Sequence, residues 1–270
     1  ILPDLAAGCS MADMATASQV EQAWQVLSEL GLAKQTIPVT YMNSSAAIKS
    51  FTGANAGTIC TSSNAERAMK WAFEQGEKVL FLPDQHLGRN TAVLKLGLKL
   101  EDCALWNPWK PRGGLSDQEI KAAKVLLWRG HCSVHGRFSL SNVEEVRKRI
   151  PGVNVLVHPE CQHDVVKAAD HVGSTEGIIK MVKSAISGSA WAIGTELNLV
   201  KRLATENPDK NVVFLDKTVC YCSTMNRIDL PHLVWAMEAL NSGRLVNQIK
   251  VDDKTATFAR LALERMLALP

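Results

Sequence analysis

Short apolar runs alternate with helix-like segments along nearly the whole chain, and this alternation is the feature that most restricts its fold. Strand-like runs at residues 37–41, 78–82 and 153–157 are each followed by polar residues and later by a segment with helical spacing of apolar side chains. Strands that are joined through helices run parallel, because each helix carries the chain back to the end of the sheet at which the preceding strand began. The sequence therefore predicts an α/β protein with short parallel sheets covered by helices on both faces.

Several helix starts are marked by the pattern Ser-x-x-Glu, in which the two side chains satisfy free backbone N–H groups of the first turn. The pattern begins at Ser63, Ser116 and Ser141. Apolar spacing further predicts a helix over residues 11–30 and a last one over residues 254–267. Residues 106–114 are rich in Trp, Pro and Gly, which predicts a surface loop.

The composition excludes several classes of protein. Of 270 residues, 46% are apolar and 21% charged, and the net charge of +3 comes without any basic run, so no nucleic-acid partner is expected. No apolar window approaches the roughly 18 residues that a membrane span needs, so no membrane partner is expected. The cysteines number seven at irregular spacing, which argues against the disulfide framework of a secreted protein and favours a cytoplasmic location.

Cysteines recur where strand-like runs give way to helices. Three connections have this form: Gly8 to Cys9 after residues 1–4, Gly130 to Cys132 after residues 125–128, and Cys220 to Cys222 after residues 212–215. A single cysteine in such a place is most often just a small buried residue. The repetition of the pattern indicates a shared site, although Cys220 and Cys222 could also form a redox pair.

The predicted strands also end in hydrogen-bonding or reactive side chains: Tyr41, Asn43, Thr61, Ser62, His158, Glu160, Ser174, Thr175 and Glu196. Parallel α/β proteins bind ligands at the carboxyl ends of their strands. Ser62-Ser63-Asn64 and Gly173-Ser174-Thr175 lie at predicted helix N-termini, whose free N–H groups suit phosphate or carboxylate. A small anion with more than one acidic group is the expected substrate. The chain has no GxGxxG or GxxxxGK[ST] motif for a nucleotide and no HExxH or paired CxxC for zinc.

Taken in order, these segments resemble the bacterial quinolinate synthases of NAD biosynthesis. The motifs that carry the resemblance run over essentially the whole chain: Gly8-Cys9-Ser10-Met11-Ala12-Asp13, Tyr41-Met42-Asn43-Ser44-Ser45, Cys60-Thr61-Ser62-Ser63-Asn64, Gly130-His131-Cys132-Ser133-Val134-His135, His158-Pro159-Glu160-Cys161, Gly173-Ser174-Thr175, Gly194-Thr195-Glu196 and Cys222-Ser223-Thr224-Met225.

The resemblance implies repeated three-layer αβα lobes around a pseudo-threefold axis with a 4Fe–4S cluster at the centre. Residues 1–133 would form a lobe that carries Cys9 and ends at Cys132, and residues 134–222 a lobe that ends at Cys222. The C-terminal helices in residues 223–270 would pack on an N-terminal lobe. Cys9, Cys132 and Cys222 would be the cluster ligands and leave one iron open as a Lewis acid. The cysteines not expected to be ligands are Cys60, Cys103 and Cys161.

The resemblance also implies a reaction, that of a transferase which joins iminoaspartate to dihydroxyacetone phosphate and releases phosphate and two waters to give quinolinate. The substrate-binding residues would be Tyr41, Asn43, Ser62, His158, Glu160, Ser174 and Thr175. Among them Tyr41, His158 and Glu160 would be catalytic, and His158 and Glu160, two apart on an extended segment, would exchange protons. The plainer alternatives are a hydrogen-bonded core histidine for His158 and a helix N-terminal charge for Glu196.

The chain departs from the family in one respect, because nothing in it matches the His-Tyr motif of the family's N-terminal lobe. A lobe on the order of 100 residues is therefore expected to be missing, and turnover without it is expected to be poor. An aspartate-oxidising enzyme earlier in the pathway is the expected protein partner. Two other functions stay open: a non-catalytic iron–sulfur or redox-sensing protein that uses Cys220 and Cys222, and a metal-free phosphate-binding α/β enzyme.

Overall fold

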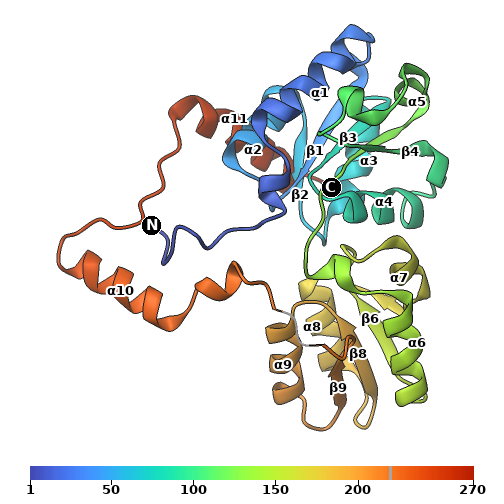
Figure 1. Ribbon diagram of the computed structural model, residues 1–270, viewed down its shortest axis with the longest axis vertical. Helices are drawn as coiled ribbons and strands as arrows, with labels where there is room; N and C mark the ends of the chain where they lie inside the picture. Colours follow the sequence, from blue (N-terminus) through green and yellow to red (C-terminus); the bar gives the residue numbers. More distant parts are fainter. Residues whose placement is uncertain (219–220) are drawn as a thin grey trace.

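The computed structural model describes residues 1–218 and 221–270, which form two lobes with one parallel sheet each (Figure 1). The first sheet has the strand order β2-β1-β3-β5-β4 and the second β7-β6-β8-β9, and all pairs within them are parallel. The strands are β1 Thr36–Tyr41, β2 Thr58–Cys60, β3 Lys78–Leu82, β4 Cys103–Trp106, β5 Val125–Trp128, β6 Asn154–Val157, β7 His171–Val172, β8 Ala190–Gly194 and β9 Asn211–Phe214.

Helices connect these strands and cover both faces of each sheet. Those of the first lobe are α1 Ala17–Glu29, α2 Ala46–Ala54, α3 Ala65–Gln75, α4 Gln85–Leu94 and α5 Asp117–Ala122. Those of the second lobe are α6 Leu140–Arg149, α7 His163–Ala168, α8 Thr175–Ser184 and α9 Leu197–Glu206. Two C-terminal helices follow, α10 Leu230–Asn241 and α11 Asp253–Leu267. The prediction of a layered α/β fold with parallel sheets is confirmed.

The three layers of the first lobe follow from the alternation of side chains along its buried strands. On β3, Phe81 joins the core beneath α3 and α4, whereas Leu80 and Leu82 join the core beneath α1, α2 and α5. Neighbouring residues of a strand point to opposite faces, so a strand that is apolar at every position needs a cover on both sides. The second lobe has two equivalent cores, one beneath α6 and α7 and one beneath α8 and α9.

The C-terminal helices differ in how they pack. Helix α11 lies against α2 of the first lobe, where Nη1 of Arg265 donates to the carbonyls of Gly53 and Gly57 at 3.0 and 2.8 Å. At Gly53 the backbone of α11 comes so close that a Cβ would lie 1.8 Å from the carbonyl oxygen of Phe258. Helix α10 stands away from both lobes in Figure 1 and exposes large apolar side chains. The packing of residues 223–270 on a further lobe stays a prediction.

Some local predictions were wrong. Residues 1–4 form no strand, and the helix expected over residues 11–30 begins only at Ala17, because Thr16 caps it in a capping box with Gln19. The capping box of α6 is formed by Ser139 with Asn142, two residues before the predicted Ser141. The predicted box of Ser116 with Glu119 is confirmed. No helix of residues 1–218 and 221–270 is long and apolar enough to cross a membrane.

Candidate active site

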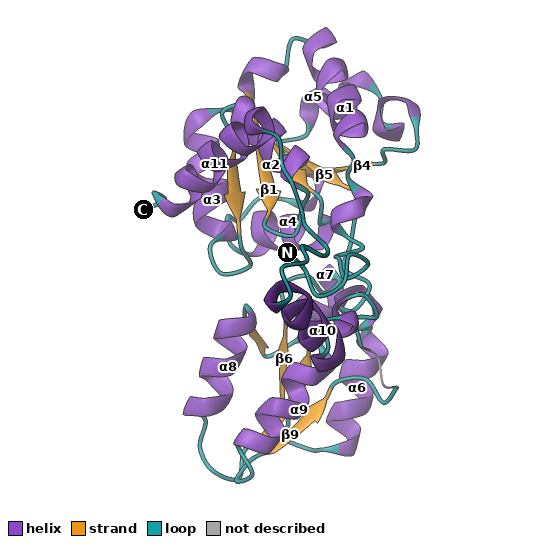
Figure 2. Ribbon diagram, turned by 90° about the vertical axis from the view of Figure 1, so that its left-hand side faces the viewer, coloured by secondary structure: helices purple, strands orange, loops and turns teal. Residues whose placement is uncertain are grey.

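Strands of both sheets end around one cavity of about 690 Å³ at the junction of the lobes, which lie one above the other in Figure 2. The wall includes Tyr41 at the end of β1, His158 just after β6 and Thr195 just after β8. This is the edge at which parallel α/β folds bind ligands, since strand ends and helix N-termini meet there. The lining is Ala7, Gly8, Cys9, Ser10, Met11, Tyr41, Asn43, Cys132, Ser133, Val134, His135, His158, Glu160, Thr175, Thr195, Glu196, Asn198, Leu199, Arg202, Cys222, Met225 and Ile228.

The three cysteines predicted as ligands, Cys9, Cys132 and Cys222, all line this cavity. Each of them is partly buried. The remaining described cysteines, Cys60, Cys103 and Cys161, are absent from the lining. The cavity thus separates these two sets of described cysteines, and the assignment of Cys9, Cys132 and Cys222 as ligands stays a prediction.

A local repeat surrounds the three lining cysteines. Each is followed by a serine, and a 3₁₀ helix begins three residues after each cysteine, at Ala12, His135 and Met225. The carbonyl of each cysteine accepts a backbone hydrogen bond of 2.9 Å from the residue three or four positions later. Sequence reasoning missed this Cys-Ser signal, which distinguishes Cys222 from its neighbour. Cys220 lies outside the described residues, and a redox pair with Cys222 stays untested.

A buried acid–base cluster forms the floor of the cavity. Nδ1 of His135 lies 2.7 Å from Oε2 of Glu160, and Nε2 of His135 lies 3.1 Å from the hydroxyl of Thr195. The rings of His135 and His158 stack with their centroids 4.4 Å apart. The Glu160 N–H donates to Nδ1 of His158 at 3.4 Å, which leaves Nε2 of that ring to carry its proton.

This cluster includes a group that could hold a metal ion. One ligand atom each from Cys132, His135 and Glu160 lie within 4.8 Å of one another. Sulfur, imidazole nitrogen and carboxylate oxygen together suit a transition metal. His135 and Glu160 are buried, and Thr195 orients the far side of the imidazole, as outer partners of metal-binding histidines do.

The surroundings set the charge of each group. Burial opposes ionisation of Glu160, but the 2.7 Å contact with His135 helps to overcome it, and the pKa of that carboxyl is lowered. Burial, helped by His135, lowers the pKa of His158 to about 3, so this imidazole is neutral at pH 7. Burial and the Glu160 carboxylate raise the pKa of Tyr41, which keeps its hydroxyl protonated. The site therefore combines one carboxylate acceptor with two neutral proton carriers.

The thiols of Cys9 and Cys132 are held in the protonated form. Burial, with smaller contributions from Cys132 and Glu160, raises the pKa of Cys9. Burial and Glu160 raise the pKa of Cys132 to about 12. Only a metal cation or another strong positive charge would make thiolates stable here.

Asp84 is a buried residue near the site that sequence reasoning did not select. It follows β3 and caps α4, since its Oδ1 accepts from the N–H groups of His86 and Leu87 at 2.7 and 2.8 Å. Its other oxygen has no hydrogen-bond partner among the described residues. Burial and the charge of Glu160 raise the pKa of Asp84, so the proton of this carboxyl pair stays on Asp84. The available signal was its position directly after a strand, the same as that of the selected residues.

The predicted substrate-binding residues fall into two neighbouring groups. Tyr41, Asn43, His158, Glu160 and Thr175 line the main cavity. Two predicted anion-binding serines, Ser62 and Ser174, instead line a smaller cavity of about 340 Å³ between α3, α4 and α8. That separation follows from helix geometry, because Ser174 caps α8 and its hydroxyl accepts from the N–H of Gly177 at 3.2 Å.

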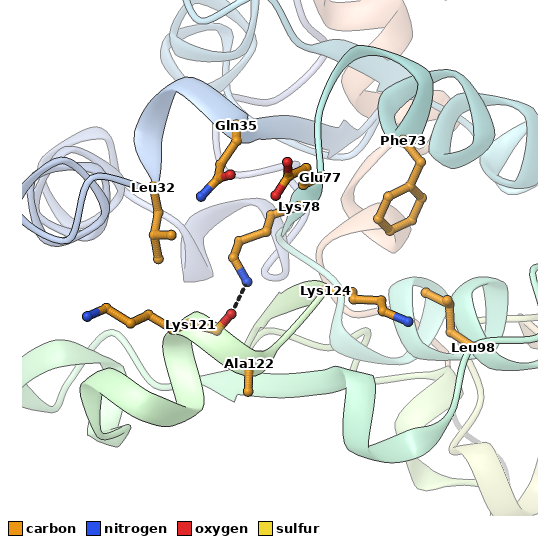
Figure 3. Close-up of a pocket in the computed structure, with 9 residues that line it drawn as sticks. All are labelled: Leu32, Gln35, Phe73, Glu77, Lys78, Leu98, Lys121, Ala122 and Lys124. Atoms are coloured by element: carbon orange, nitrogen blue, oxygen red, sulfur yellow. Dashed lines mark hydrogen bonds between the residues drawn. The ribbon is translucent and has the colours of Figure 1, made fainter.

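A further cavity, of about 390 Å³, contains three lysines but does not form an anion site (Figure 3). Nζ of Lys78 donates to the carbonyls of Lys121 and Ala123, at the end of α5. Lys124 pairs with Asp102 at 3.3 Å. In Figure 3 the amino groups of Lys121 and Lys124 point away from each other, so the two charges do not converge on one anion-binding position.

Comparison with known proteins gives a consistent family assignment. The family model described as quinolinate synthetase A protein matches residues 1–268. A quinolinate synthase of Streptomyces coelicolor is 71% identical over 272 residues, which cover 100% of this chain and 69% of the relative. Those of Nocardioides and Rhodopirellula baltica are 66% and 52% identical and are covered to 70% and 69% of their lengths, again with 100% of this chain.

Proposed function

Because this chain belongs to the quinolinate synthetase A family of enzymes, we propose that it condenses iminoaspartate with dihydroxyacetone phosphate to form quinolinate for NAD biosynthesis. Phosphate and two waters are the other products. The observation that carries the proposal is the meeting of Cys9, Cys132 and Cys222 with Tyr41 and Glu160 on one cavity. These residues come from separate parts of the chain and share no structural role that would bring them together.

The donor set fits an iron–sulfur cluster. Three cysteines from three separate segments line one cavity, and burial keeps the Cys9 and Cys132 thiols protonated until a cation arrives. We propose that Cys9, Cys132 and Cys222 hold a 4Fe–4S cluster. With three protein ligands, such a cluster supplies one open iron that acts as a Lewis acid toward a substrate hydroxyl or carboxylate.

The side chains around the cavity would handle the protons of the reaction. Glu160 is the acceptor, and His135 holds it in place through the 2.7 Å contact from Nδ1. His158 carries its proton on Nε2 and Tyr41 on its hydroxyl, so both donate to a substrate oxygen or nitrogen without a net charge of their own. A neutral donor beside an ionised acceptor suits dehydration, in which one carbon loses a proton while an oxygen elsewhere gains one.

Substrate anions would be bound by neutral donors. Asn43 and Thr175 border the main cavity, and Ser62 and Ser174 border the adjacent one. We propose that the first pair holds a carboxylate and the second pair the phosphate-bearing end, at the N-termini of α3 and α8. A protein partner that supplies the imine, such as an aspartate-oxidising enzyme, and a cytoplasmic location remain proposals.

The test of the function is anaerobic purification, measurement of iron, sulfide and visible absorbance, and an assay for quinolinate from both substrates. Cluster content with quinolinate formation is the expected result. A cluster without quinolinate formation would favour the iron–sulfur or redox-sensing alternative, and an active protein without iron would favour the metal-free one.

Serine substitutions then test the ligand set. Cys9→Ser, Cys132→Ser and Cys222→Ser should each lose the broad visible absorbance, whereas the control Cys103→Ser should keep it. A full cluster in Cys222→Ser together with loss in Cys220→Ser would show that the wrong cysteine of this pair was chosen.

A further inference from the structure

One side chain of the first lobe holds the backbone of the second lobe at the catalytic loop. Asn90 on α4 is 3% exposed and its amide reaches residues 158–163 across the junction. Its Nδ2 donates to the carbonyls of Pro159 and Cys161 at 2.8 and 2.9 Å. Its Oδ1 lies 2.8 Å from Nδ1 of His163.

Both polar atoms of the Asn90 amide group, Nδ2 and Oδ1, take part in these contacts. Two partners are carbonyl oxygens, so the nitrogen must face them and the oxygen must accept from the His163 ring. Asn90 thereby satisfies the carbonyls on both sides of Glu160, and no aspartate or leucine of similar size could replace it. Buried amides that are fully paired fix geometry well, because any displacement leaves polar groups without partners.

The helix that carries Asn90 is itself held firmly. Asp84 caps its first turn, and Gly88 allows it to lie directly on the sheet, where a Cβ would be 2.6 Å from Leu127 and 2.7 Å from Phe81. Because α4 is fixed on the first sheet, the hydrogen bonds of Asn90 fix the loop of the second lobe relative to that sheet. Figures 1 and 2 both place α4 and α7 side by side at the junction.

The held loop is the one whose side chains act at the cavity. Tyr41 ends β1 and Cys132 follows β5 in the first lobe, whereas Glu160 follows β6 in the second. The placement of Glu160 relative to both depends on how the lobes meet. From this geometry we infer that Asn90 is a positioning residue, which sets the carboxylate of Glu160 against Tyr41 and the metal-binding cysteines. The inference rests on the proposed function.

The test compares Asn90→Ala and Asn90→Asp with the wild type in the quinolinate assay, with iron content and melting temperature measured on the same samples. The Asp variant keeps the size of the side chain but places a carboxylate oxygen, which cannot donate a hydrogen bond, beside the carbonyl oxygens of Pro159 and Cys161. A displacement near 1 Å at a reacting centre costs about 100-fold in rate. Both variants should lose about 10- to 100-fold in kcat, with KM changed less than threefold and iron content retained. Asn207→Ala removes another buried asparagine, whose Nδ2 donates to the carbonyl of Leu203 at 2.8 Å and which lines neither cavity, so it is the matched control and should keep the wild-type kcat.

A double-mutant cycle with Tyr41→Phe separates positioning from general support of the fold. If Asn90 acts by setting Glu160 against Tyr41, its loss should cost much less in the Tyr41→Phe background than in the wild type. Additive losses, or a kcat within twofold of wild type in either Asn90 variant, would overturn the inference. If Asn90→Ala does not fold, the isosteric Asn90→Asp decides alone. A wild type with intact fold and cluster that is inactive both as the 270-residue chain and in a form extended with the unmatched part of a relative would instead overturn the proposed function.

Discussion

His158 and Glu160 lie two residues apart in one buried loop, yet their surroundings give them opposite roles. The pKa of Glu160 is lowered, because the contact with His135 helps to outweigh the cost of burial, and His158 is neutral because burial dominates. Pairs of titratable groups whose environments push their pKa values apart are typical of acid–base sites. A core histidine of purely structural use would not need to border the cavity, as His158 does.

This assignment predicts that His158→Ala keeps normal iron and sulfide content but loses at least about 100-fold in kcat, the low end for a general acid–base group. The reason is that the His158 ring borders the cavity, where it would donate a proton, but is not one of the three proposed cluster ligands. Steady-state quinolinate formation and iron analysis on the same preparation are the measurements. A coloured variant with near-normal turnover would return His158 to the role of a hydrogen-bonded core residue.

The low pKa of His158 also predicts a pH dependence of stability. Between pH 6.5 and about 3 the unfolded chain binds a proton on this ring and the folded protein does not. The free energy of unfolding should therefore fall as pH drops through this interval, by up to about 1.4 kcal/mol per pH unit from this one group. His86, whose pKa burial and Arg89 lower to about 4, adds to the fall in the same direction.

Urea unfolding of the wild type and of His158→Gln between pH 7 and pH 4 measures that contribution. The variant should show the flatter dependence, because it removes a group that only the unfolded state protonates. Val155→Ala, which deletes buried volume in β6 without a titratable group, should lower stability by the same amount at every pH. Parallel curves for wild type and His158→Gln would contradict the prediction.

At the level of elements, sequence pattern predicted the strands better than the helices. Residues 79–82 are apolar, and β3, which begins with Lys78 and has the predicted bounds 78–82, is buried at every position. Helix α4 gave no such signal, because the residues it buries include Gly88, Asn90 and Thr91, which form no apolar stripe. Their burial reflects contacts with the sheet and the other lobe, which sequence spacing does not contain. The motifs selected the lining cysteines, but the split of Ser62 and Ser174 from the main cavity depends on how the lobes meet.

The connection from β5 to Cys132 depends on a glycine. Gly130 pairs with Asp84 in an isolated bridge, and a Cβ at this position would lie 2.3 Å from the carbonyl oxygen of Pro83. We predict that Gly130→Ala pushes the two segments apart, lowers stability by about 1–3 kcal/mol as overpacked sites do, and reduces cluster content. The same substitution at Gly177, where a Cβ meets only the Ser174 hydroxyl at 3.4 Å, should be neutral or stabilising in its helix.

Thermal melting and iron content of the two alanine variants test this prediction. The two sites lie in different lobes, so each variant controls for the other. Equal melting temperatures and full iron content in both would show that β3 and β5 can separate at Gly130 without displacing Cys132.

On the scale of the molecule, α10 is the part whose packing within the described residues is least complete. Leu230 and Met237 are 74% and 60% exposed, and Trp235 is 46% exposed. The segments before and after the helix are joined to the start of the chain, by the ion pair of Arg227 with Asp4 at 2.6 Å and by a hydrogen bond from the Leu2 N–H to the carbonyl of Asn247. Contiguous apolar surface of this kind marks an interaction site more often than a free surface.

The relatives contain sequence that this chain does not match, since the 270 residues cover 69% of the Streptomyces coelicolor protein. We predict that such additional sequence packs on the exposed face of α10 and closes the cavity that Cys222 and Met225 border. Closure would exclude water and oxygen, which strengthens electrostatic interactions at the site and protects reactive intermediates.

The 270-residue chain, reconstituted anaerobically, should therefore form less quinolinate and lose its cluster faster in air than a form extended with the unmatched part of the relative. Trp235→Ser in the extended form should shift it toward the behaviour of the short chain, because it weakens the contact without touching the cavity lining. Equal activity and equal oxygen sensitivity of the short and extended forms would show that the two lobes and α10 already complete the site.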